Sequence, residues 1–389
     1  MVFESLGLEE IDVYPRLPVA VRSAKGCELV LADGRSVLDL YGGHCVNTLG
    51  AGDAGLERVI QRQWSKLSFA TNLLDHEPRR EFLAALAPTL PARADGEAWR
   101  VFCSNSGAEA NENALKLALD ATRRTVVVAF GGAFHGRTAG AAAVTDGKKA
   151  FPAAPFEVRR VPFGDLAAAR VAIDESVAAV ILEPIQSLAG VVDPPSGFLE
   201  KLRNACARVG TALIFDEVQT GNGRLGAFWA GQHFGVVPDV FTTAKGAAGG
   251  LPIGLTIARE RFTRHAKHGT LGSTFGGGPV VLAAAAEVAR RVATSGFLAN
   301  VRAASSALRA AAERGPVVSV RGAGLLLGLV LDEGLAAADV RDALLERGVL
   351  VGTSNDPRVL RLSPPLTLRP EQAERFALAF ESLSLERSR

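Results

Sequence analysis

The stretch 211–250, TALIFDEVQTGNGRLGAFWAGQHFGVVPDVFTTAKGAAGG, holds two short apolar runs that each end in charged residues. The run at 211–218 ends in an acidic pair that includes Asp216, and the run at 239–245 ends in Lys245. Both runs have the length and the β-branched and aromatic content of buried strands. The glycine-rich residues 246–250 follow Lys245, and backbone without side chains can approach a ligand closely. The stretch therefore predicts two strands that present charged groups where the chain leaves a sheet.

Similar apolar runs lie upstream, at 99–105, 125–130 and 178–184. Helical patterns at 55–67 and 107–122 separate several of them. Short apolar strands alternating with helices predict an α/β fold with a mainly parallel sheet that is covered on both faces. Ligands on such sheets bind at the carboxyl ends of the strands, so the residues at those ends are the candidates for a site.

The two ends of the chain have a different pattern. Residues 1–45 suggest an irregular arm followed by strands, with a hairpin signal at Asp33-Gly34. After about residue 280 an alanine-rich helix at 279–296 precedes strands at 317–331 and 359–366. We expect an N-terminal segment, 1–45, that contributes to a smaller domain, a large ligand-binding domain at 46–280, and a smaller α+β domain at 281–389. A chain of 389 residues is long enough for this division.

Composition excludes several classes of function. The chain is 48% hydrophobic and 22% charged, and its net charge is only +2 with no one-sided basic cluster, which argues against nucleic-acid binding. No apolar run of about 18 residues lacks charge, so no membrane span is expected. The first residues lack the order of a signal peptide. The widely spaced Cys27, Cys45, Cys103 and Cys206 suggest free thiols in a reducing compartment rather than a zinc site, so we expect a cytoplasmic protein without a metal.

Three features of the sequence suggest a ligand site, although each has a simpler explanation. The segment 103–111, CSNSGAEAN, follows a strand and opens a helix, which is typical of an anion site or of a plain helix cap at Ser104 or Ser106. A buried Asp216 needs a cationic partner, whereas an exposed one needs none. A buried Lys245 has a lowered pKa and can attack a carbonyl group, whereas a surface lysine is only a solvated charge.

These three features together match one cofactor. A phosphate site, a carboxylate at a strand end and a lysine at a strand end are what pyridoxal phosphate (PLP) requires. The lysine holds the cofactor aldehyde, the carboxylate keeps the ring nitrogen protonated, and the helix N-terminus holds the phosphate.

The sequence also resembles a known family over residues 14 to about 380. It is similar to the class III, ornithine-type aminotransferases of PLP fold type I, and among them most to the acetylornithine aminotransferases. Six motifs in this order carry the resemblance: NSGAEANENALKLA, AFHGRTAGA, AAVILEPIQ, LIFDEVQTGNGRLG, PDVFTTAKGAAGGLPIG and GSTFGGGP. The resemblance implies a large domain built on a mainly parallel seven-stranded sheet, a smaller α+β domain, and a homodimer with shared active sites.

The resemblance also implies roles for residues at matching positions. Lys245 and Asp216 are expected to be catalytic, as the lysine that holds the cofactor and the partner of its ring nitrogen, and Glu183 is expected to support them. The expected cofactor contacts are the phosphate loop Ser106, Gly107 and Ala108, the ring contacts Phe134, Val218 and Gln219, and Thr274 from the neighbouring subunit. For Phe134 and Val218, simple core packing would favour the same apolar residue types.

Substrate recognition is implied in the same way. Arg137, assisted by Tyr14, matches the arginine that binds the substrate α-carboxylate, and Arg361 matches the arginine that binds 2-oxoglutarate or glutamate. The expected reaction moves the distal amine of an acetylornithine-like amino acid to 2-oxoglutarate, giving a semialdehyde and glutamate. Where the family usually has EPIQGEGG, this chain has EPIQSLAG, so Leu188 replaces a glutamate that masks the later arginine. Arg361 should therefore stay exposed or find another partner.

Several alternatives remain open at this stage. The amine donor could be an N-acyl-lysine, a carrier-linked lysine, 4-aminobutyrate or a diamine. A PLP racemase or decarboxylase of the same fold would share the apparatus, and a non-catalytic scaffold would share only the fold. The intact Lys245, Asp216 and phosphate loop argue against the scaffold.

Overall fold

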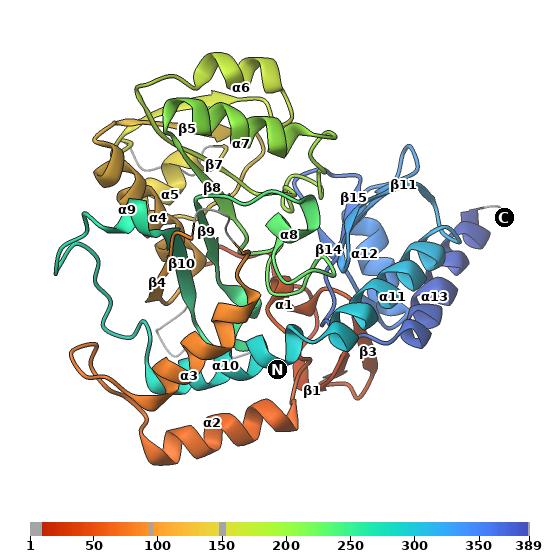
Figure 1. Ribbon diagram of the computed structural model, residues 1–389. Helices are drawn as coiled ribbons and strands as arrows, with labels where there is room; N and C mark the ends of the chain where they lie inside the picture. The colour runs from red at the N-terminus through yellow and green to blue at the C-terminus, as the bar shows by residue number, and fades with distance from the viewer. Residues whose placement is uncertain (1–9, 93–95, 148–152, 388–389) are drawn as a thin grey trace.

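The computed structural model describes residues 10–92, 96–147 and 153–387, and a seven-stranded sheet forms its centre (Figure 1). The strand order is β4-β10-β9-β8-β7-β5-β6. The strands are β4 (Trp99–Ser104), β5 (Val126–Phe130), β6 (Glu157–Val161), β7 (Val177–Leu182), β8 (Ala212–Asp216), β9 (Val240–Thr243) and β10 (Gly254–Arg259). Only β10 is antiparallel to its neighbours β4 and β9, so the other six strands run in one direction. The expected mainly parallel seven-stranded sheet is confirmed.

Helices bury both faces of this sheet. On one face α6 (Leu166–Ala172) and α7 (Phe198–Val209) share a core with bulky side chains such as Leu213 and Phe215. On the other face α4 (Gly107–Thr122), α5 (Ala139–Val144) and α9 (Glu260–Thr263) pack against smaller ones such as Ala212. Successive residues of a strand point to opposite faces, so each of these strands contributes to both cores.

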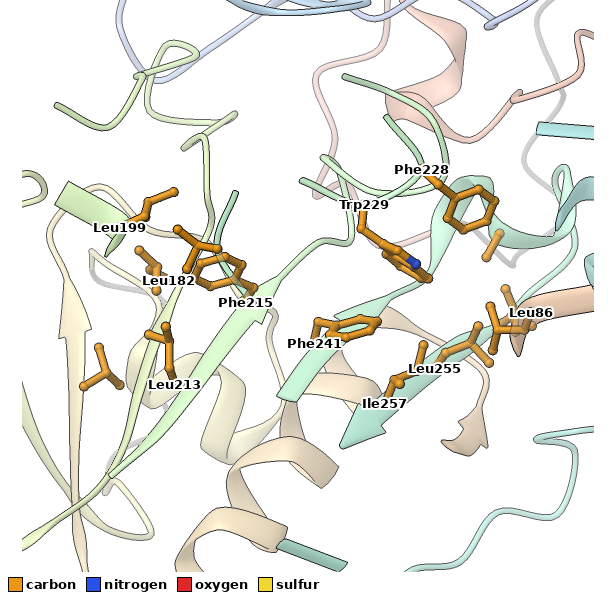
Figure 2. Close-up of a cluster of buried hydrophobic side chains, with 14 of the residues drawn as sticks. Leu86, Leu182, Leu199, Leu213, Phe215, Phe228, Trp229, Phe241, Leu255 and Ile257 are labelled. Carbon is orange, nitrogen blue, oxygen red and sulfur yellow. The ribbon is translucent and has the colours of Figure 1, made fainter. Parts of the chain in front are cut away.

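The larger core reaches the strand ends where the site lies. Figure 2 shows Trp229 between Phe228 and Phe241, with Phe215 on the next strand. The ring centroids of Trp229 and Phe241 are 4.7 Å apart, and the indole nitrogen donates to Thr89 Oγ1 at 3.2 Å. Aromatic packing at this density holds the strand ends in one arrangement.

The alanine-rich helix α10 (Pro279–Val292) belongs to the large core, contrary to the expected boundary after residue 280. It packs against α2 (Ala54–Lys66) and α3 (Glu77–Leu86), and its buried side chains share the core of the seven-stranded sheet. The single helix expected at 279–296 ends at Val292, because Thr294 caps the next helix, α11 (Ser295–Ala312). The helical pattern of the sequence is continuous over 279–296, so it did not indicate that the first part of this stretch packs into the core of the large sheet.

The rest of the chain builds two four-stranded sheets beside the large one (Figure 1). One has the order β1-β2-β3-β13 and the other the order β11-β12-β15-β14. Their strands are β1 (Val21–Lys25), β2 (Glu28–Leu31), β3 (Ser36–Asp39), β11 (Val317–Ala323), β12 (Leu326–Leu331), β13 (Val349–Leu350), β14 (Gly352–Thr353) and β15 (Val359–Leu362). Helices α11, α12 (Ala337–Glu346) and α13 (Ala373–Arg387) accompany them.

The N-terminal segment is part of this smaller unit. Strands β2 and β3 form the hairpin expected at Asp33-Gly34, and β3 pairs in parallel with β13.

None of the helices in the described part of the chain is long and apolar enough to cross a membrane. All four cysteines are free thiols.

Candidate active site

A cavity of about 400 Å³ opens where the parallel strands of the large sheet end. Ten of the residues singled out from the sequence line it: Ser106, Gly107, Ala108, Phe134, Arg137, Glu183, Asp216, Val218, Gln219 and Lys245. Because β4, β5, β7, β8 and β9 run in the same direction, the segments that follow them meet at one edge. The fold therefore brings these residues together as the sequence predicted.

Asp216, the last residue of β8, is held on three sides. Its Oδ2 accepts from the side-chain amide of Asn111 at 2.7 Å and lies 2.8 Å from Nδ1 of His135, and its Oδ1 accepts from the backbone N–H of Val218 at 3.0 Å. Asn111 is itself fixed, since its carbonyl accepts from Thr242 at 2.6 Å. The carboxylate is 3% exposed. Such a network fixes its orientation toward the cavity.

Lys245 follows β9 in an unusual backbone conformation. Its φ of 40° lies in the left-handed region, which non-glycine residues rarely adopt and which often marks functional sites. The next residue, Gly246, is clamped by Thr48, whose hydroxyl donates to its carbonyl at 2.8 Å. A Cβ on Gly246 would lie 2.3 Å from that hydroxyl oxygen.

The surroundings of Lys245 favour its neutral amine. Burial lowers the pKa of Lys245, and nearby acidic groups, including Asp216 and Glu183, oppose that effect only in part. A neutral amine is the form that attacks a carbonyl group and accepts a proton.

The expected phosphate loop lies at the N-terminus of α4, a helix of 16 residues. The Ser106 hydroxyl caps the helix by accepting from the backbone N–H of Glu109 at 3.2 Å. The first N–H groups of a helix lack partners within the helix and attract anions. A Cβ on Gly254 would lie 2.1 Å from the carbonyl oxygen of Ser106, so only glycine allows β10 this close to the loop.

Glu183 supports the cavity wall. Its carboxylate accepts from the backbone N–H of Phe134 at 2.9 Å and from that of Ser187 at 3.3 Å. Burial raises its pKa to about 7. Glu183 thus ties the segment that carries Phe134 to the end of β7.

Glu217, next to Asp216, has a different environment. It accepts from two backbone N–H groups at the start of α8 (Ala230–Phe234) and does not line the cavity. Burial raises its pKa to about 7. Of the two adjacent acids, the structure directs only Asp216 to the cavity.

Two arginines lie near the cavity in contrasting environments. Arg137 is exposed, and its guanidinium lies 5.2 Å from the ring centroid of Phe134. Arg361, on β15, is only 3% exposed and does not line the cavity itself. Its guanidinium donates to the hydroxyls of Ser187 and Tyr41, so of the two expected outcomes it finds other partners rather than staying exposed.

Two expected site residues, Tyr14 and Thr274, do not line the cavity of their own chain. Tyr14 is 65% exposed, and Thr274 is also exposed. The structure adds Asn111 and His135, the partners of Asp216, which sequence analysis missed. Both lie inside the quoted motifs. Asn111 is about one helical turn after Gly107, and His135 directly follows Phe134, so their closeness to expected site residues could have indicated them. No motif marked Tyr41.

A buried lysine, a fixed carboxylate and a long helix N-terminus around one cavity are the donor set of a PLP site, and the residues present fit that cofactor. Fold and site together define a PLP-dependent enzyme.

Comparisons with known proteins agree. The family model for class-III aminotransferases matches residues 12–383. The chain is 42% identical over 376 residues to an acetylornithine aminotransferase of Mycobacterium bovis, covering 95% of this chain and 92% of that protein. It is 44% identical over 369 residues to that of Streptomyces coelicolor, covering 93% and 89%.

A solved structure of an N-acetylornithine aminotransferase from Stenotrophomonas maltophilia has a TM-score of 0.81 at 32% identity, covering 96% of this chain and 98% of that one. An ornithine aminotransferase from Toxoplasma gondii, described with PLP at partial occupancy in its active site, has a TM-score of 0.89 at 26% identity and covers 97% and 93%. The chain belongs to the class-III aminotransferases.

Proposed function

We propose that this aminotransferase moves the distal amine of an acetylornithine-like, N-acylated diamino acid to 2-oxoglutarate, giving a semialdehyde and glutamate. Relatives that bear the name acetylornithine aminotransferase support this donor class. The observation that carries the proposal is Arg137, an exposed guanidinium on the wall of the cavity that holds Lys245. No described carboxylate forms an ion pair with it, so it is available for the α-carboxylate of a substrate.

The residues of the cavity have separate tasks. When bound, PLP supplies an aldehyde that receives the amine and a ring that withdraws electrons from the reacting carbon. Lys245 Nζ, whose pKa is lowered by burial, would hold the aldehyde of the bound cofactor and would serve as the group that accepts and returns a proton. Asp216 keeps the ring nitrogen protonated. Ser106, Gly107 and Ala108 hold the phosphate with backbone N–H groups.

The ring itself is positioned by its neighbours. We propose that Phe134 and Val218 pack against its two faces and that Gln219 reaches its hydroxyl group. Glu183 keeps the backbone of Phe134 in place. Arg361 then binds a carboxylate of 2-oxoglutarate or glutamate, and Tyr14 assists Arg137.

The donor class is tested by the half-reaction of the holoenzyme with N-acetylornithine, followed by the loss of the cofactor absorbance. Removing a charged hydrogen-bond partner costs about 1.5–3 kcal/mol, so R137A should lower kcat/KM about 10- to 150-fold. A carboxylate-free control donor, butane-1,4-diamine, should be affected far less. A wild-type enzyme that prefers the diamine, or an R137A variant that loses both activities equally, would refute the donor class.

We also propose that the working form is a homodimer with shared active sites. An apolar patch, formed by Leu67, Phe69, Leu73, Leu74 and Phe275, is exposed on the described surface. Leu73 is 91% exposed, Phe275 is 67% exposed, and the rings of Phe69 and Phe275 lie 5.8 Å apart. Exposed patches of this kind mark interaction sites. Thr274 lies between Phe275 and Ser273, and the Ser273 hydroxyl accepts from Asn105, which lines the cavity. The patch therefore lies near the cavity, and a second copy seated on it would bring its own Thr274 toward this cavity.

Sedimentation of wild-type protein and F275E tests the dimer. We expect wild type to sediment as a dimer and F275E to dissociate and bind PLP more weakly. T274A should remain dimeric but bind PLP more weakly. A monomeric wild type that retains full activity would refute the shared site.

The remaining proposals concern organisation. We place the boundary between the large and small domains at 293–294, between α10 and α11, with the N-terminal segment contributing to the small domain. A cytoplasmic location fits the four free thiols and the bacterial relatives.

A further inference from the structure

Arg361 has an unusual set of partners for a buried charge. Its Nε donates to the carbonyl of Thr353 at 3.0 Å, its Nη1 to Ser187 Oγ at 3.0 Å and more weakly to Gln219 Oε1 at 3.5 Å, and its Nη2 to Tyr41 Oη at 2.8 Å. All four acceptors are neutral. Within residues 10–92, 96–147 and 153–387, no carboxylate forms an ion pair with this guanidinium.

A neutral set of acceptors orients a guanidinium without cancelling its charge. Burying a charge without a counter-ion is costly, and a forked guanidinium matches a carboxylate in shape and charge. This charge also acts on titratable groups nearby. The charge of Arg361 adds to burial in lowering the pKa of Lys245 and of His44. Arg361 also stands directly behind the cavity wall, because its Nη1 lies 3.5 Å from Oε1 of Gln219, which lines the cavity together with Lys245.

Tyr41 is firmly positioned for its part in this arrangement. Its ring lies below the guanidinium, with 5.5 Å between the ring centroid and the central carbon of Arg361. A Cβ on Gly352 would lie 2.1 Å from the ring, so the absence of a side chain there makes room for it. The Tyr41 backbone is held as well, because its N–H donates to Asp39 at 2.9 Å and its carbonyl accepts from Ser363 at 2.8 Å.

We propose that Tyr41 and Ser187 are specificity-determining positioning residues that hold Arg361 with neutral oxygens and so leave its charge free for a carboxylate in both half-reactions. The inference rests on the proposed function, in which Arg361 binds the carboxylate of the amine acceptor. A dicarboxylate then enters this subsite while the enzyme waits for its amine donor, because no carboxylate of the described residues has to leave the guanidinium first. Donors that carry a carboxylate on the reacting carbon are accepted beside those with a distal amine.

The test uses glutarate, a dicarboxylate without an amine that binds but cannot react. Calorimetric titration of the PLP-loaded enzyme gives its Kd for wild type, S187D and S187N. The two variants have side chains of nearly equal size and differ in charge, so their comparison isolates the charge beside Arg361. A carboxylate at this distance competes directly for the guanidinium, so S187D should raise the Kd at least about tenfold, whereas S187N should raise it less than about threefold.

Kinetics of the separate half-reactions provide a second readout. In S187D, kcat/KM for glutamate should fall in parallel with glutarate binding, while the value for N-acetylornithine should change little. Y41F, which keeps the ring and removes the hydroxyl, should weaken glutarate binding severalfold without altering the cofactor absorbance. Thermal melting confirms that each variant is folded.

The outcomes separate the inference from the proposed function. A wild type that does not bind glutarate, or equal losses in S187D and S187N, would overturn the inference. If S187D is not folded, an unchanged glutarate Kd in Y41F would overturn it. A wild type that binds glutarate and reacts with glutamate but not with N-acetylornithine would refute only the proposed donor.

Discussion

Replacing Asp216 with asparagine tests the buried carboxylate most sharply. In wild type its two oxygens have three hydrogen-bonded neighbours, with Asn111 and His135 on Oδ2 and the Val218 N–H on Oδ1. Asparagine offers one oxygen and one NH2 group, so in either orientation at least one neighbour faces a donor. A buried donor left without a partner costs about 1–3 kcal/mol, which sets the expected loss of stability.

The loss of activity in D216N should be larger than the loss of stability suggests. In the proposed mechanism the variant also lacks the negative charge that would face the protonated ring nitrogen, and removing one partner of a buried ion pair costs about 3–5 kcal/mol. At 1.36 kcal/mol per decade, kcat/KM should fall by about 10²- to 10⁴-fold. Stopped-flow absorbance of the amine-donor half-reaction, with holoenzyme at saturating PLP, measures this loss.

The adjacent acid provides the matched control for D216N. E217Q also removes a buried carboxylate, but Glu217 bonds to the start of α8 and does not line the cavity. Its kcat/KM should stay near that of wild type below its melting temperature. If D216N retains activity within tenfold of wild type, or if folded E217Q loses as much as D216N, the assigned role of Asp216 is refuted.

Two further predictions concern the phosphate loop and pH. In G254A the new Cβ would lie 2.1 Å from the Ser106 carbonyl oxygen, so this variant should bind PLP much more weakly than wild type. G296A is the control, because no atom lies within 4 Å of its new Cβ, and its PLP affinity should not change. Equal PLP affinity of the two variants in equilibrium dialysis would contradict the role of Gly254 in shaping the loop. Burial raises the pKa of Glu183 and of Glu217 from 4.5 to about 7, so the folded chain binds more protons than the unfolded chain between these values, and their contribution to stability falls as pH rises from about 4.5 to about 7. In urea unfolding, the free energy of wild type minus that of E217Q should therefore decrease over this pH range, and a constant difference would show that burial does not perturb Glu217.

The sequence predicted the large sheet and the cavity walls because each depends on local patterns. Apolar runs such as 125–130 and 211–218 became strands, and the rule for parallel sheets correctly placed the charged groups that follow them at one edge. The motif at 103–111 supported both a helix cap and an anion site. Ser106 caps α4 and also lines the cavity, so the helix-cap interpretation and the anion-site interpretation are compatible.

The missed features depend on contacts between distant segments. Tyr41 meets Arg361 across 320 positions of sequence, and the substitution at Leu188 did not show that the neighbouring Ser187 would supply a hydroxyl. The boundary near residue 280 failed for a similar reason. An alanine-rich helix has apolar side chains that suit either core, and only tertiary packing assigned α10 to the large one.

The most direct test of the account is to identify the lysine that holds the cofactor. Borohydride reduction of the holoenzyme, followed by proteolysis and mass spectrometry, locates the covalent link between amine and aldehyde. We expect the added cofactor mass on the peptide that contains Lys245, with no such mass in K245A. Cofactor attached to a different lysine in wild type, or an unmodified Lys245 peptide from fully loaded enzyme, would contradict it.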